Sequence, residues 1–196
     1  MASLDKSNGY EEIASVFVAE RGRNSSGVGA SVVADWSQTL PRAARVLDLG
    51  CGTGIPISQA LIERGFNVHG VDASPTMIAA FRARYPSVPL ECAAVEDSDF
   101  FGETFEGVVA WGLFFLLDAP AQHRLIKKIA GALRRGGRLL FTAPSQSCSW
   151  RDVMTGRTSI ALGREAYKKI LEVEAISLLA THVDEGENHY YFGQKT

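Results

Sequence analysis

One stretch of the chain combines an acidic residue with closely spaced glycines. In VLDLGCGTGIP, residues 46–56, an apolar run reaches Asp48 and leads into Gly50, Gly52 and Gly54. Glycines let the backbone turn tightly and approach a ligand, and the start of a following helix offers free N–H groups to an anionic ligand group. Asp72 follows 18 residues after Gly54, where a carboxylate can accept hydrogen bonds from ribose hydroxyls. These features together indicate an adenosine-type ligand.

The glycine spacing argues against a dinucleotide. A dinucleotide fingerprint requires Gly-x-Gly-x-x-Gly, whereas Ile55 stands here where the third glycine belongs, because the third glycine comes early at Gly54. Pyrophosphate binding is therefore disfavoured. A nicotinamide-dependent oxidoreductase is left as a minor alternative, to be revived by nicotinamide-cofactor binding.

Short aliphatic runs alternate with helical patterns and predict an α/β fold with a doubly wound, mostly parallel sheet. Nearly continuous apolar runs are typical of strands that are covered on both faces. Helices are predicted between Gly54 and Gly65, from Ser74 and Pro75 onward, and over residues 120–134 and 164–174. The predicted strands are residues 46–49, 68–71, 88–94, 107–111 and 138–142.

The two ends of the chain have other patterns. Helix-spaced apolar residues at 10–17 and a second run at 28–36 predict an N-terminal cap. Residues 143–163 have no clear period and predict a long active-site loop. Two runs, 176–183 and 188–194, predict an antiparallel C-terminal hairpin that closes the sheet. We therefore expect a single domain over 1–196, with the cap at 1–42, the cofactor-binding core at 43–143, and the substrate loop, helix and hairpin at 144–196.

Composition narrows the class of partner. The 196 residues carry 20 Lys and Arg against 22 Asp and Glu, with 46% hydrophobic residues, which is typical of a globular protein. A net charge of −2 favours a small-molecule partner over nucleic acid or a membrane. Three scattered cysteines predict neither a disulfide framework nor a metal site, and they favour a cytoplasmic location. The N-terminus lacks a signal pattern, and the most apolar run, 108–117, is shorter than the roughly 20 residues of a membrane span.

These motifs together resemble the class I S-adenosylmethionine-dependent methyltransferases over residues 44–143. The matching features are the Asp48-x-Gly50-x-Gly52-x-Gly54 turn, Asp72, the Glu96-Asp97 pair, and the Gly136-Gly137 lead into the fifth strand. The resemblance implies a Rossmann-like fold with a seven-stranded sheet whose last strand is inserted antiparallel. It also implies S-adenosyl-L-methionine as cofactor and S-adenosyl-L-homocysteine as product.

The resemblance assigns roles to residues. It implies that the glycine turn wraps the methionine portion, that Asp72 holds the ribose, and that the backbone of Trp111 and Gly112 reaches the cofactor's amino group. Tyr10 is either a packing residue or an aromatic wall near the sulfonium, and Arg21 and Arg23 are expected in solvent. The family often has an aspartate where Ala94 stands here, so adenine recognition falls to Glu96 or to the backbone. The predicted cofactor-binding residues are Tyr10, Asp48, Gly50, Cys51, Gly52, Gly54, Asp72, Ala73, Ser74, Met77, Val95, Glu96 and Trp111.

The predicted reaction is transfer of a methyl group to an O or N atom of a small molecule by in-line displacement, mainly through proximity and orientation. His189 or His182 is the candidate general base, and the alternative is a solvated face of the last hairpin. Phe115, Trp150 and Tyr191 are candidate substrate contacts, although the phenylalanine is equally well explained as core. A non-catalytic S-adenosylmethionine-binding protein, acting as a regulatory or partner subunit, is the alternative function. The sequence leaves monomer and homodimer both open.

Overall fold

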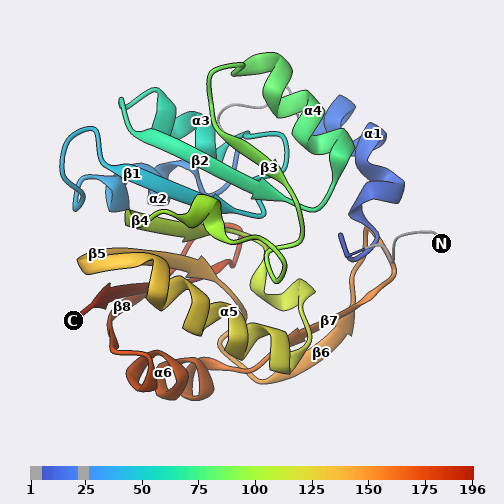
Figure 1. Cartoon of the computed structure of the whole chain (residues 1–196). Helices are drawn as coiled ribbons and strands as arrows, with labels where there is room; N and C mark the ends of the chain where they lie inside the picture. The colour runs from blue at the N-terminus through green and yellow to red at the C-terminus, as the bar shows by residue number, and fades with distance from the viewer. Residues whose placement is uncertain (1–5, 22–26) are drawn as a thin grey trace.

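Seven strands form the central sheet in the order β3-β2-β1-β4-β5-β9-β8 (Figure 1). This computed structural model describes residues 6–21 and 27–196, so the predicted exposure of Arg23, and of the Arg21 side chain, lies outside the described part. The parallel strands are β1 (Arg45–Leu49), β2 (Asn67–Asp72), β3 (Leu90–Cys92), β4 (Phe105–Ala110) and β5 (Leu133–Thr142). β9 (His189–Lys195) lies antiparallel to both β5 and β8 (Ile176–Val183). The predicted sheet and its closing hairpin are confirmed.

Helices cover both faces of the sheet. The helices α5 (Ala119–Ala132) and α6 (Arg164–Val173) pack on one face, as Figure 1 shows. On the other face lie α2 (Ala30–Ser37), α3 (Ile57–Ile62) and α4 (Pro75–Arg84), and α1 (Tyr10–Arg21) packs against α4. None of the helices among the described residues is long and apolar enough to span a membrane.

Side-chain alternation along the strands explains this two-sided core. In β1, Leu47 belongs to the hydrophobic cluster under α5, whereas Val46 belongs to the cluster under α2 and α3. Val108 and Val109 of β4 divide in the same way. Successive strand side chains point to opposite faces, so a run that is apolar at every position requires cover on both sides.

The helix starts follow the sequence signals. Ser74 caps α4, since its Oγ accepts the N–H of Met77 at 3.1 Å, and Pro75 occupies the first turn. Asp118 caps α5 in the same way, with its carboxylate 2.7 Å from the N–H of Ala121. A side-chain acceptor at this position satisfies one of the backbone donors that a helix start leaves unpaired.

The predicted long loop at 143–163 is wrong. It contains a two-stranded antiparallel sheet of β6 (Cys148–Arg151) and β7 (Thr158–Ala161), which is separate from the main sheet. Each strand has only four residues and half of the eight side chains are exposed, so no run of alternating large apolar residues marks them in the sequence. The prediction for residues 88–94 is also too long, because β3 has three residues, and α5 ends at Ala132, before Gly136.

A buried polar network fixes this small sheet against the helices. The hydroxyl of Tyr167, in α6, donates to Gln122 Oε1 of α5 at 2.7 Å and accepts the N–H of Leu162 at 3.2 Å. Gln122 Nε2 in turn donates to the carbonyls of Leu117 and Ile160, at 2.9 and 2.8 Å. Because Tyr167 and Gln122 are both fully buried, each partner would be left unsatisfied if the other were removed.

We expect Tyr167→Phe to lower the free energy of unfolding by about 1–3 kcal/mol, because it leaves buried polar groups of Gln122 and Leu162 without a partner. Urea denaturation measures this loss. Tyr191→Phe is the matched control, since that hydroxyl makes only a long contact of 3.4 Å with the carbonyl of Pro144. Equal losses in the two variants would contradict the role assigned to the network.

Candidate active site

A cavity of about 590 Å³ opens at the carboxyl ends of β1, β2 and β4. In a parallel α/β sheet, this is the edge at which ligands bind, where the strand order reverses. The reversal lies between β1 and β4, which are neighbours in the sheet although β2 and β3 intervene in the chain. The lining comes from the turn after β1, the ends of β2 and β4, the N-terminal segment and the last hairpin.

The glycine turn after β1 is held by backbone hydrogen bonds. The N–H groups of Gly50 and Cys51 both donate to the carbonyl of Val71 in β2, at 2.8 and 3.1 Å. Gly50 and Gly52 have φ values of +72° and +52°, which favour glycine. A Cβ at Gly52 would have only the Met77 sulfur nearby, at 3.6 Å, so the backbone borders open cavity there.

Asp72 connects this turn to α4. Its carboxylate accepts the N–H of Gly52 on one oxygen and the N–H of Ser74 on the other, both at 2.8 Å. Burial raises the pKa of the Asp72 carboxyl, and these two backbone hydrogen bonds oppose that shift. Each carboxylate oxygen has a second lone pair, so Asp72 can accept further hydrogen bonds from a ligand in the cavity.

Asp48 is the second acidic residue of the cavity. Its side chain is 1% exposed and accepts a hydrogen bond of 2.6 Å from the hydroxyl of Ser58. Burial raises the pKa of Asp48 to about 7, with the hydrogen bond from Ser58 acting in the opposite direction. The carboxyl of Asp48 therefore titrates near neutral pH.

The N-terminal segment closes one side of the cavity. Glu11 of α1 accepts hydrogen bonds from the hydroxyls of Ser74 and Thr76, the latter at 2.6 Å. Lys6 forms an ion pair of 2.6 Å with Asp97 in the segment after β3. These contacts place Tyr10 against the cavity.

The last hairpin closes the other side through a chain of hydrogen bonds. Trp111 Nε1 donates to the hydroxyl of Tyr190 at 3.0 Å, and that hydroxyl donates to Asp184 at 2.6 Å. The carboxylate of Asp184 also accepts the N–H groups of Gly186 and Asn188, both at 2.9 Å. Its pKa is lowered by these hydrogen bonds, which outweigh the opposing effect of burial. One carboxylate thus orients both the Trp111 ring and the turn that lines the cavity.

The structure gathers most of the predicted cofactor residues around this cavity. Gly54 and Ser74 do not line it: Gly54 packs against the ring of Phe81, where a Cβ would lie 2.9 Å from the ring carbons, and Ser74 caps α4. The residues that do line it are Tyr10, Asp48, Gly50, Cys51, Gly52, Asp72, Ala73, Met77, Val95, Glu96 and Trp111.

Four predicted catalytic and substrate residues do not line this cavity, and their roles stay predictions. His182 is exposed on the outer strand β8, and His189, at the start of β9, is half-buried outside the lining. Tyr191 is buried and stacks on Phe141 at 4.6 Å, because alternation along β9 directs it into the cluster under α6. The rings of Trp150 and Phe115 lie against each other, with their centroids 5.5 Å apart. Of these two residues, only Phe115 lines the cavity.

Several lining residues were not predicted. Thr53 is 2% exposed, and its Oγ1 has no hydrogen-bond partner within the described chain. The Nδ2 atom of Asn8 is likewise buried and unpartnered there. Thr53 lies within the glycine turn, so the glycine motif could have predicted that it lines the cavity. Asn8 and Asn188 lie in segments where no sequence motif indicates a ligand site. Within the described residues, no cluster of His, Cys, Asp and Glu forms a metal site.

Comparison with known proteins shows which proteins this chain is similar to. Residues 46–137 match the methyltransferase domain family. An uncharacterized methyltransferase of Mycobacterium tuberculosis is 39% identical over 106 residues, covering 54% of this chain and 41% of that protein. Residues 46–137, a little under half of the chain, are therefore similar to a methyltransferase domain. Asp48, Asp72 and Trp111 lie within the matched residues, whereas Tyr10 and Asn188 lie outside them.

Two solved structures share the fold of this chain. One is an amino pentose methyltransferase from Micromonospora echinaspora with bound S-adenosylmethionine, with a TM-score of 0.71 and 19% identity over 94% of this chain and 97% of that chain. The other is a 1,6-didemethyltoxoflavin-N1-methyltransferase from Burkholderia thailandensis with bound 1,6-didemethyltoxoflavin and S-adenosylhomocysteine. It has a TM-score of 0.72 and 21% identity over 100% of this chain and 93% of that chain.

The raised pKa of Asp48 predicts a pH dependence of stability. Between about pH 4 and about pH 7 the unfolded carboxyl is ionised while the folded one keeps its proton, so the folded state loses stability as pH rises through this range. We expect the free energy of unfolding of the natural protein to fall, relative to that of Asp48→Asn, by about 1.4 kcal/mol per pH unit. Urea denaturation at several pH values measures this slope, and a difference that does not vary with pH would contradict it.

Proposed function

We propose that this protein is an S-adenosylmethionine-dependent methyltransferase that transfers a methyl group to an O or N atom of a small molecule. The observation that carries the proposal is the cavity at the carboxyl edge of the sheet, where the glycine turn, Asp72 and Glu96 lie together. The two solved neighbours have S-adenosylmethionine or S-adenosylhomocysteine bound, and both are methyltransferases of small molecules, an amino pentose and 1,6-didemethyltoxoflavin.

The residues of this chain fit such a cofactor. Gly52 has backbone next to open cavity, where a side chain would occupy the space. The buried hydroxyl of Thr53 lies on the lining without a partner in the described chain, and a polar ligand group would satisfy it. The carboxylate of Asp72 keeps lone pairs that ribose hydroxyls can use. The lining thus has both the space and the polar groups that the cofactor requires.

Each part of the lining has a distinct task in this proposal. Asp72 holds the ribose, the glycine turn lies along the methionine portion, and Glu96 with Val95 meets the adenine edge. Met77 and Ala73 flank the adenine. The backbone carbonyls of Trp111 and Gly112 face the cofactor's amino group. Tyr10 would serve as an aromatic wall near the sulfonium, where a ring face stabilises a cation.

Catalysis then follows from positioning. S-adenosylmethionine supplies a sulfonium-bound methyl group, which is already strongly electrophilic. The protein therefore has to orient the acceptor atom and exclude water, which lowers the entropic part of the barrier. The N-terminal segment covers the cavity through the hydrogen bonds of Glu11, and the turn ordered by Asp184 covers its other side. Phe17, Trp111 and Phe115 give the acceptor an aromatic surface.

Formation of S-adenosylhomocysteine tests the reaction. The protein is incubated with S-adenosylmethionine and a panel of phenols, amino sugars and heteroaromatic amines, and the product is quantified by mass spectrometry. Acceptor-dependent formation of S-adenosylhomocysteine supports the proposal. Tight cofactor binding without turnover on any acceptor would instead favour a non-catalytic binding protein.

We expect Asp72→Ala to weaken binding of S-adenosylhomocysteine by about 1.5–3 kcal/mol, because it removes hydrogen bonds from the ribose to a charged group. Isothermal titration calorimetry measures the change. Asp35→Ala is the control, since Asp35 is an exposed acid on α2 that does not line the cavity. If Asp72→Ala bound S-adenosylhomocysteine with unchanged affinity, the proposal that Asp72 holds the ribose would be wrong.

A further inference from the structure

A second cavity, of about 690 Å³, lies at the opposite edge of the sheet. It is lined by residues 39–45 before β1, by the starts of β2 and β4, and by residues 134–138 of β5. In the described part of the chain, the two cavities share no lining residue. We name the second cavity the arginine groove, because Arg42, Arg45, Arg134, Arg135 and Arg138 all line it.

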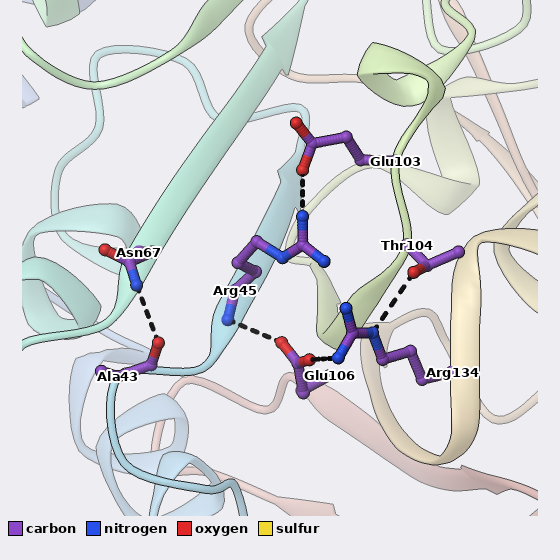
Figure 2. Close-up of polar contacts among 7 residues, drawn as sticks. All are labelled: Ala43, Arg45, Asn67, Glu103, Thr104, Glu106 and Arg134. Carbon is purple, nitrogen blue, oxygen red and sulfur yellow. Dashed lines mark hydrogen bonds and ion pairs between the residues drawn. The ribbon is translucent and has the colours of Figure 1, made fainter.

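Two of these arginines form the frame of the groove, as Figure 2 shows. Glu106, at the start of β4, accepts the backbone N–H of Arg45 at 2.8 Å and forms an ion pair of 2.6 Å with Arg134. The Arg45 guanidinium pairs with Glu103, and Arg134 Nε donates to Thr104 Oγ1 at 3.2 Å. These contacts hold the loop before β1 close to the start of β5, so the two walls of the groove are tied together.

The three other arginines carry uncompensated charge. Arg42 and Arg135 are exposed and Arg138 is half-buried, and none of them forms a hydrogen bond or ion pair through its side chain within the described chain. Five arginines against Glu103 and Glu106 leave an excess of three positive charges in a chain whose net charge is −2. Like charges around one depression repel each other, and a multiply charged anion would relieve that repulsion.

We propose that the arginine groove binds a small phosphorylated molecule through its phosphoryl oxygens. The planar guanidinium group donates two parallel hydrogen bonds to such oxygens, and Arg42 and Arg135 come from the two segments, 39–45 and 134–138, that line the groove. The proposal concerns residues outside the cofactor cavity, so it does not rest on the proposed function.

The size and lining of the groove favour a small phosphorylated molecule over a nucleic acid or a phospholipid membrane. Its volume falls within the roughly 300–1,000 Å³ of small-molecule sites, and its free arginines all line the same depression. The lining includes no aromatic side chain on which a nucleobase would stack. The large apolar side chains exposed in the described chain all lie elsewhere, so the groove has none to insert into a membrane.

Calorimetry with sodium pyrophosphate at low ionic strength tests the proposal. We expect the natural protein to bind pyrophosphate with a dissociation constant of about 1 mM or tighter. The double variant Arg42→Gln/Arg135→Gln should bind it at least about tenfold more weakly, because two charge-assisted contacts are lost. Both arginines are unpaired in the described chain, so the variant should keep its thermal unfolding temperature.

Three controls make the result decisive. Arg124→Gln/Lys127→Gln removes two exposed charges from α5, away from the groove, and should bind pyrophosphate as the natural protein does. Citrate tests for attraction to any trianion, and a single-stranded RNA oligonucleotide tests for a nucleic-acid surface. The proposal would be overturned if the natural protein did not bind pyrophosphate, or if it bound citrate as tightly as pyrophosphate. It would also be overturned if the α5 variant lost as much pyrophosphate binding as the double variant, or if the double variant lost binding of RNA but not of pyrophosphate.

Discussion

The carboxylate of Asp72 joins the two backbone segments on which the cofactor cavity depends. It accepts one N–H from the glycine turn and one from the start of α4, each at 2.8 Å. Without the Asp72 carboxylate, the N–H groups of Gly52 and Ser74 would have no hydrogen-bond acceptor at the edge of the cavity. The position of Gly52, the α4 start and the adjacent Met77 therefore all depend on one half-buried acid at the end of β2. Its burial raises its pKa, which is the electrostatic consequence of placing a carboxylate there.

The two edges of the sheet have opposite electrostatic character. Asp48, Asp72 and Glu96 line the cavity at the carboxyl edge, whereas arginines dominate the groove at the amino edge. A sulfonium carries a positive charge, so the acidic edge suits the proposed cofactor, and an anion suits the other edge. The overall net charge of −2 hides this separation, because it averages the two edges.

Much of the fold was predictable because local signals and burial agree. The alternating apolar runs, the glycine turn and the Ser74 cap each have a direct counterpart in the structure. The hairpin of β6 and β7 was not predictable, since its short exposed strands are positioned by the buried contact between Tyr167 and Gln122 rather than by a hydrophobic pattern. Tertiary contacts of this kind leave little trace in the sequence.

The site was predictable where it lies within the motif and less so where it is assembled from distant segments. The β1–β2 region contributes residues that the glycine spacing indicates. Asn188 reaches the cavity only because Asp184 orders its turn, and alternation along β9 buries Tyr191 in the cluster under α6. Candidate bases chosen by residue type, such as His189, therefore required the strand geometry before they could be placed.

The central claim is that the cavity holds S-adenosylmethionine, and direct calorimetry of the natural protein tests it most simply. Separate titrations with S-adenosylmethionine, S-adenosylhomocysteine and a nicotinamide dinucleotide require no knowledge of the acceptor. The account predicts micromolar or tighter binding of the first two, with one site per chain, and no binding of the dinucleotide. A folded protein that binds neither sulfur compound, or that prefers the dinucleotide, would contradict it.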